Sequence, residues 1–145
     1  MGMIERYAAY AEAFEEAYES DNWSVLDPYF TEDAVYDFIA APPLGGRHEG
    51  RATVLNDFKD AVNGFDRLFK SRKVELLEGP VEKDGGVWVH WVATYTLEGA
   101  PELRMEGEER ASFEGDRIRL LEDRVTDEEG TKIGTYMAEH GGKLG

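Results

Sequence analysis

The stretch "GGVWVHWVATYTLEG", residues 85–99, determines the predicted fold. It has the composition of a strand, and side chains along a strand point in turn to opposite faces. One face carries Val87, Val89, Trp91, Ala93 and Tyr95, and the other carries Trp88, His90 and Val92. Neither face is polar enough to be fully exposed to solvent, so we expect each face to be buried against another part of the protein or against a partner.

The chain has 145 residues, of which 41% are hydrophobic and 12% aromatic, and this suits a globular protein with a sizeable core. We expect a single domain over residues 1–145, with a core at about 4–127 and a tail at 128–145. The absence of cysteine excludes disulfides, thiolate metal sites and cysteine nucleophiles. No apolar run is long enough to span a membrane, and the acidic N-terminus is not a secretory signal, so a cytoplasmic location is expected.

The charge is strongly negative, with 31 acidic residues against 16 basic ones and a formal net charge of -15. A surface of this sign repels phosphates, so nucleic acids and anionic membranes are disfavoured as partners. The acidity is typical of a soluble protein, and a high-salt host is the alternative interpretation.

Hydrophobic spacing predicts the order of the elements. A helix is expected over about residues 4–18, a short second helix over 23–30, a strand over 33–40, a loop over 41–50 and a third helix over about 51–69. The period then changes to two, which predicts four antiparallel strands joined by turns, followed by a tail that forms a short helix or stays loose. Because the helices are segregated from a meander of four strands, the fold class is α+β, with a curved antiparallel or mixed sheet under about three N-terminal helices. The second face of the 85–99 strand is then left for another subunit, and we expect a homodimer through Trp88, His90 and Val92.

Three carboxylates fall on apolar faces of predicted strands. Glu109 shares a face with Met105 and Phe113, Asp123 lies on the face of Leu121 and Val125, and Asp37 lies on the face of Val35 and Ile39. An ionised carboxylate is costly to bury, so each must be paired, hydrated in a cavity or protonated. In a hydrophobic pocket such groups serve as general acids, bases or hydrogen-bond donors. The alternative is a structural role, in which each is tied to a backbone N–H or an arginine.

The three histidines show no spacing that suits a metal site, and no metal or cofactor is expected. His90 lies on the face opposite Trp91, which favours an interface over catalysis. His48 lies in the loop, where Arg47 and Arg51 would form a small cationic rim, but a solvated turn is the favoured interpretation. The chain has no phosphate-binding glycine loop, no serine-centred elbow and no dinucleotide fingerprint.

Four segments together resemble a known family. They are "NWSVLDPYFTEDAVYDF", "GRHEGRATVLNDF", "GPVEKDGGVWVHWVATYTLEG" and "SFEGDRIRLLEDRVTD", and their order and spacing carry the likeness over about residues 4–127. The chain resembles the SnoaL-like and ketosteroid-isomerase-like branch of the nuclear-transport-factor-2-like superfamily. The resemblance implies an α+β cone around a pocket, and dimers that often form through the outer face of the sheet.

The resemblance implies counterparts in this sequence for only some of the family's catalytic residues. Phe14 stands where ketosteroid isomerases have an oxyanion-binding tyrosine, and Glu109 stands at the place of the acid that donates the second hydrogen bond. Asp37 matches the base only with a one-residue gap, and Phe38 takes that place without it. Asp123 resembles an acidic position of the epoxide-hydrolase-like members. The resemblance therefore favours isomerase, cyclase or epoxide-hydrolase chemistry in general over ketosteroid isomerisation itself.

The sequence thus predicts a cone with a hydrophobic pocket and a polar centre at Glu109, with Asp37 and Asp123 as its partners. The expected lining residues are Phe14, Tyr18, Trp23, Phe58, Trp91, Tyr95 and Met105. The expected function is acid–base chemistry on a small apolar carbonyl or epoxide compound, without a cofactor. The alternative is a non-catalytic module that binds a small ligand or dimerises.

Overall fold

The computed structural model of the chain describes residues 2–42 and 45–144. These residues form α-helices, short 3-10 helices and strands in the order that the spacing predicted, with one added strand. In chain order the elements are α1 (Met3–Ser20), η1 (Trp23–Tyr29), β1 (Phe30–Ile39), β2 (Gly46–Glu49), α2 (Arg51–Gly64), η2 (Asp66–Leu68), β3 (Ser71–Lys83), β4 (Gly86–Thr96), β5 (Leu103–Glu114), β6 (Arg117–Arg124), α3 (Asp127–His140) and η3 (Gly141–Lys143).

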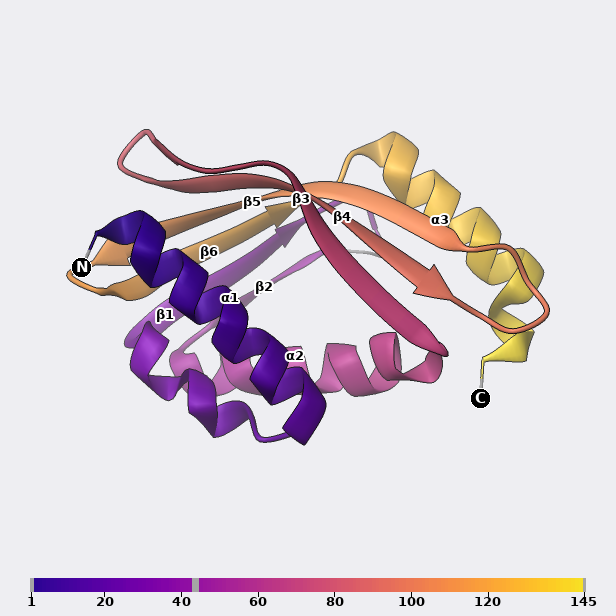
Figure 1. The fold of residues 1–145 in the computed structure, drawn as a ribbon, viewed down its shortest axis with the longest axis horizontal. Coiled ribbons are helices and arrows are strands. Elements are labelled where there is room, and N and C mark those ends of the chain that lie inside the picture. The colour runs from indigo at the N-terminus through magenta and orange to yellow at the C-terminus, as the bar shows by residue number, and fades with distance from the viewer. Residues whose placement is uncertain (1, 43–44, 145) are drawn as a thin grey trace.

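The strands form one six-stranded sheet in the order β2-β1-β6-β5-β4-β3. Strand β1 runs parallel to β6, and every other pair of neighbours is antiparallel, so the sheet is mixed. Figure 1 shows α1 and α2 gathered on one side of the curved sheet, and α3 at the end of the molecule away from the N-terminus. The α+β fold with a mixed sheet and N-terminal helices is confirmed.

The addition is β2, and the tail takes the helical one of its two expected forms. Residues 41–50 were predicted as a loop, yet β2 pairs with β1 in register from Val35–Glu49 to Phe38–Gly46. A strand of four residues is too short to show the two-residue period of a strand, and the glycines around it are typical of a loop. The tail forms α3, whose first turn is capped by Thr126 through a bond from the Glu129 N–H at 3.2 Å. Three acidic residues in that first turn stabilise the N-terminal end of its dipole.

Helix α1 turns its apolar stripe to the sheet, and Tyr7 and Tyr10 are both buried. The helix ends at Asp21, whose backbone is left-handed at φ 58 and whose N–H donates to the carbonyl of Ala17 at 2.8 Å. The chain then enters η1 at once, because the side chain of Asn22 accepts from the N–H of Ser24. This tight corner places α1 beside η1 and β3, over the concave face of the sheet.

The two faces of β4 have different covers. Val87 and Val89 are fully or almost fully buried in the core under α1. On the outer face Trp88 and His90 are partly exposed, while Val92 is only 5% exposed because its own sheet neighbours already enclose it. Val92 therefore offers little area to a second subunit, in contrast to the expectation.

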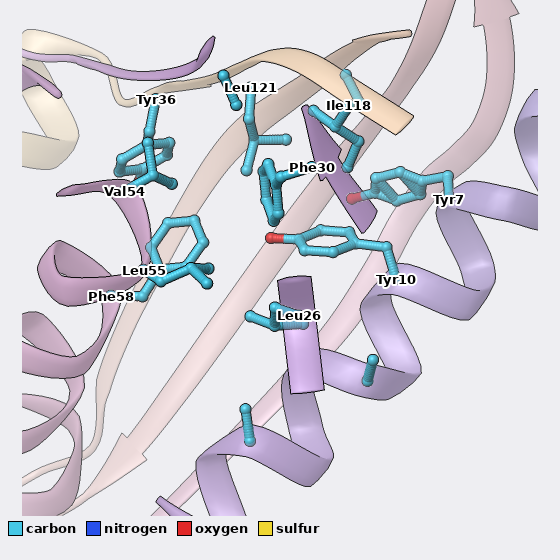
Figure 2. Packing of buried hydrophobic residues seen from close by; sticks show 14 of the residues in the cluster. Tyr7, Tyr10, Leu26, Phe30, Tyr36, Val54, Leu55, Phe58, Ile118 and Leu121 are labelled. Atoms are coloured by element: carbon cyan, nitrogen blue, oxygen red, sulfur yellow. The ribbon is translucent and has the colours of Figure 1, made fainter. Parts of the chain in front are cut away.

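The core lies between the helices and the sheet. Figure 2 shows its main part, where Tyr7 and Tyr10 of α1 meet Phe30 and where Phe58 of α2 lies close to Leu55 and Val54. The ring of Tyr10 packs edge-on against Phe30 with centroids 5.4 Å apart. A second cluster joins β4 and β5 to Ile133 and Tyr136 of α3. No helix in the described part of the chain has the length and apolar character needed to cross a bilayer.

Candidate functional site

A cavity of about 560 Å³ lies between the helices and the concave face of the sheet. Its walls come from α1, α2 and all the long strands, and Ile133 of α3 reaches it at the far end. Most of the lining is apolar or aromatic. Polar side chains reach the cavity in three groups: a pair of carboxyls on the sheet, a histidine–aspartate pair, and an arginine held between two acids.

The carboxyl pair consists of Glu109 on β5 and Asp123 on β6. The two residues are directly opposite each other in the antiparallel register, so their side chains leave the same face of the sheet side by side. The hydroxyl of Tyr7 on α1 donates to Glu109 Oε1 at 2.5 Å. The hydroxyl of Tyr36 on β1 donates to Asp123 Oδ2 at 2.7 Å. Two tyrosines from separate elements therefore flank the two acids.

Burial sets the protonation of this pair. Enclosure by the protein raises the pKa of Glu109 well above its usual value, and the charge of Asp123 and the hydrogen bond between the two groups raise it further. Burial also raises the pKa of Asp123, but bonds from Glu109 and Tyr36 oppose that rise. The two acids lie close enough to titrate as one unit, and the rise is larger at Glu109, so Glu109 is the member that holds its proton more strongly.

Trp91 completes the wall beside the pair. Gly107 faces it across the β4–β5 ladder, and a Cβ at position 107 would lie 2.4 Å from Cζ2 of the indole. Only glycine at this position leaves room for the ring to lie over β5. The buried indole N–H lies close enough to Asp123 to lower the pKa of that carboxyl, yet it makes no hydrogen bond within the described residues.

The other two polar groups lie apart from the carboxyl pair. His48 on β2 stacks on the ring of Tyr36 at 16° between planes, and its Nε2 lies 3.1 Å from Asp57 Oδ1 on α2. Arg72 on β3 binds Asp66 through Nε at 2.9 Å and Glu15 on α1 at 2.9 Å. These contacts fix helices to strands and leave both cationic side chains engaged.

The structure brings together two of the three predicted carboxylates. Glu109 and Asp123 meet on the cavity wall, whereas Asp37 lies on the outer face with Oδ2 3.5 Å from Arg47, and it does not line the cavity. The alternation along β1 was read correctly, but the face of Val35 and Asp37 is the convex one. Tyr36 occupies the concave face instead.

The predicted lining is also partly reproduced. Phe14, Phe58, Trp91, Tyr95 and Met105 line the cavity. Trp23 is buried behind Phe14 with ring centroids 5.4 Å apart, and it belongs to the core. Tyr18 faces away from the cavity and stacks under Arg67 and Arg72. Aromatic residues on the first helix have the same spacing whether they pack in the core or line a cavity, so the sequence could not distinguish the two.

Sequence reasoning missed both tyrosines of the site. Tyr7 had been read only as part of the apolar stripe of the first helix, and the tyrosine position was assigned to Phe14, two turns further along. Tyr36 was on the face taken as external. Arg47 and Arg51, considered as a cationic rim beside His48, are both paired with acids: Arg47 lies with Asp37 and Glu49, and Arg51 lies 3.8 Å from Asp27. Among the described residues, no cluster of His, Asp and Glu could hold a metal ion.

Comparisons with known proteins agree with this architecture. The SnoaL-like domain family matches residues 11–126. No curated protein sequence matches the chain. Among solved structures, a proposed isomerase from Bacillus subtilis is similar at a TM-score of 0.70 and 15% identity, over 95% of this chain and 96% of that one.

Two further structures share the fold. An LEH-like epoxide hydrolase from M. tuberculosis is 13% identical at a TM-score of 0.63, over 94% of this chain and 96% of that one. An NTF2-like protein from Burkholderia pseudomallei is 14% identical at a TM-score of 0.60, over 83% and 90% of the two chains. At these identities the likeness concerns the fold, while the family match spans most of the sequence. The chain therefore belongs to the SnoaL-like domain family, with the fold of NTF2-like proteins.

Proposed function

We propose that this protein is an acid–base enzyme that acts on a small, mostly apolar carbonyl or epoxide compound. The observation that carries the proposal is the Glu109–Asp123 pair, whose two carboxyls face each other at the wall of a cavity and accept hydrogen bonds from Tyr7 and Tyr36. An acid and a base side by side on one rigid sheet face are the minimum equipment for moving a proton between two atoms of one ligand.

One proton on the pair is sufficient both for the isomerisation of a ketone and for the hydrolysis of an epoxide. With a ketone, Asp123 takes a proton from the carbon next to the carbonyl while Glu109 gives its proton to the carbonyl oxygen, which yields the enol. Where the ketone has a C=C bond next to that carbon, the product is a dienol; Asp123 then returns its proton to the far carbon of the double bond while the enol oxygen returns its proton to Glu109, which completes an isomerisation. With an epoxide, Asp123 takes a proton from the attacking water while Glu109 protonates the ring oxygen. In each case the pair still holds one proton afterwards.

The cavity and the relatives support this choice of substrate. A volume of about 560 Å³ suits a ligand of small-molecule size. Aromatic side chains such as Phe14, Phe58 and Trp91 form an apolar wall against which such a ligand would pack. Structures of the same fold carry names that include an isomerase and an epoxide hydrolase, which are the two reaction classes that this pair can serve.

The test compares three variants on a panel of cyclic ketones and epoxides, with products identified by mass spectrometry. Glu109→Gln and Asp123→Asn keep the size of each group but remove its proton chemistry, and we expect each to lose about a hundredfold or more of the rate. Asp37→Asn is the matched control, because it makes the same change on the outer face of the sheet. Equal rates for all three variants would refute the assignment.

The alternative is a cavity that binds a ligand without changing it. One observation favours it: each acid already has a tyrosine partner, so the four groups satisfy one another within the protein. In that case a panel compound binds to wild-type protein, no product forms, and the Glu109→Gln variant binds as tightly as the wild type.

A further inference from the structure

The ionisable groups around the cavity are mostly acidic. Glu15, Asp57, Asp66, Glu109 and Asp123 line it, and the basic residues of the described lining are His48 and Arg72. The sequence as a whole is acidic, but an excess of acids on the protein surface acts only through solvent and is screened by salt. Charges on the walls of an apolar cavity are screened far less, so they act directly on a bound ligand.

Arg72 has no free charge to offer a ligand. It lies at 2.9 Å from an oxygen of Asp66 and at 2.9 Å from an oxygen of Glu15, and its side chain is only 10% exposed. The hydroxyl of Tyr95 also donates to Asp66 at 3.1 Å, which holds that carboxylate in place. One guanidinium between two carboxylates leaves the group with a net negative charge.

His48 is engaged in the same way. Its Nε2 lies 3.1 Å from Asp57, and its ring is nearly parallel to that of Tyr36, with centroids 6.4 Å apart. A ligand anion near His48 would therefore meet the Asp57 carboxylate as well. Within the part of the chain that the structure describes, every cationic side chain on the cavity wall is paired with an acid.

We infer that the cavity selects uncharged, oxygen-bearing ligands and excludes anions of the same shape, such as carboxylates, sulfates and phosphates. A neutral oxygen can accept the proton of Glu109 or the buried N–H of Trp91, whose nitrogen has no partner in the described residues. An anion at the same place meets the buried Glu109–Asp123 pair, and the basic residues of the described lining are already paired with acids. This inference rests on the proposed function only in requiring that the cavity binds a small molecule.

The test uses pairs of probes that differ in charge but not in shape. An acetyl group and a carboxylate are close in size, so 2-acetylnaphthalene is paired with 2-naphthoate, and acetophenone with benzoate. Dissociation constants are measured by calorimetry on the full chain at about pH 7 and about 0.15 M NaCl. We expect the ketone of each pair to bind at least about tenfold more tightly, which corresponds to about 1.4 kcal/mol.

Variants locate the cause of the selectivity. Asp66→Asn releases Arg72 from one of its two acids, and we expect the preference for the ketone to fall several-fold. Glu15→Gln makes a similar release from the exposed end of Arg72, and it serves if Asp66→Asn does not fold. Glu32→Gln is the matched control, since it removes one exposed charge outside the cavity, and it should leave the preference unchanged.

The outcomes separate this inference from the proposed function. A carboxylate that binds as tightly as its ketone, or more tightly, overturns the inference and leaves the acid–base proposal standing. A preference that falls equally in Glu32→Gln and Asp66→Asn assigns the effect to the overall charge and also overturns it. A cavity that binds no member of either pair contradicts both the inference and the proposed function.

Discussion

Glu109 is a residue whose burial should make the stability of the protein depend on pH. Its pKa is raised well above the usual value of 4.5, mainly by burial. Below pH 4.5 the group is protonated in both the folded and the unfolded chain, and its contribution is fully present. As the pH rises through the window up to the raised pKa, only the unfolded chain releases the proton, so the free energy of unfolding falls. The slope for one proton is at most about 1.4 kcal/mol per pH unit.

The variant Glu109→Gln isolates this effect. Glutamine keeps a carbonyl for Tyr7 and offers an N–H to Asp123, but it does not titrate. We therefore expect the variant to gain stability relative to wild type as the pH rises, measured by urea unfolding between about pH 5 and about pH 8. Glu32→Gln, on the surface, corrects for the general repulsion of an acidic chain. Parallel pH profiles for Glu109→Gln and wild type would show that Glu109 ionises normally.

Tyr7 provides a second test at the same site. Its hydrogen bond to Glu109 lowers the pKa of that acid, so Tyr7→Phe should raise the pKa further. Loss of the bond should also lower the free energy of unfolding by about 1 kcal/mol. The pKa is read from the carboxyl carbon signals of glutamate by NMR titration. Tyr10→Phe is the control one turn along, because Tyr10 bonds to neither acid in the described contacts, and it should leave the Glu109 signal in place.

These residues also show what the sequence could predict. Glu109 and Asp123 could be found because a carboxylate on an apolar stripe is a local signal. The choice between Tyr36 and Asp37 could not be made, since both faces of β1 carry apolar residues and only the position of the helices decides which face is concave. Tyr7 gave no signal at all, because a tyrosine on an amphipathic helix has the same spacing as a core residue.

At the scale of elements, the packing of β4 on β5 depends on Gly107. A Cβ there would lie 2.4 Å from the indole of Trp91 and 2.9 Å from the carbonyl oxygen of Arg124. Gly107→Ala should therefore displace Trp91 and destabilise the fold by about 1–3 kcal/mol. The displacement is measured as a shift of the tryptophan fluorescence together with the urea midpoint.

Gly134 of α3 is the matched glycine for that experiment. Nothing lies within 4 Å of a Cβ built on it, and it sits inside a helix. Gly134→Ala should stabilise the protein by about 0.5–1 kcal/mol and leave the fluorescence unchanged. If both substitutions behaved alike, the close contact of Trp91 with Gly107 would be disproved.

The elements themselves were predictable to different degrees. The long strands and helices follow from local period, and they were placed within a few residues. The parallel pairing of β1 with β6 joins segments such as Tyr36 and Leu121 that are far apart in the chain, and no local pattern encodes it. This pairing brings Tyr36 to Asp123, so the site depends on the one contact that local reasoning misses.

At the scale of the whole molecule, the convex face of the sheet differs from the acidic surface around it. Three arginines alternate with three glutamates on β5 and β6, namely Arg104, Arg110, Arg124, Glu106, Glu108 and Glu122. This balance of signs allows two copies to approach at that face despite a net charge of -15 for each chain. Trp88 and His90 lie beside these charges on β4 and are only partly covered.

We propose that the protein forms a homodimer through this convex face, with Trp88 and His90 at its centre. Trp88→Ser should weaken the dimer by about tenfold or more, since buried tryptophans contribute most to such interfaces. Sedimentation velocity over a range of concentrations gives the dissociation constant. Leu68→Ser is the control, because Leu68 is 39% exposed but lies on η2, away from this face.

The net charge adds a second expectation for the same measurement. Two chains that each carry a net charge of -15 repel one another. At physiological ionic strength, salt largely screens this repulsion between charges that are more than about 8 Å apart. The wild-type dimer should therefore become tighter between about 0.05 M and about 0.5 M NaCl. A dimer held mainly by ion pairs between the arginines and glutamates would weaken over that range. A monomer at every salt concentration would assign the partly covered Trp88 to the surface of a single chain, where Lys83 Nζ already lies 5.2 Å from its ring.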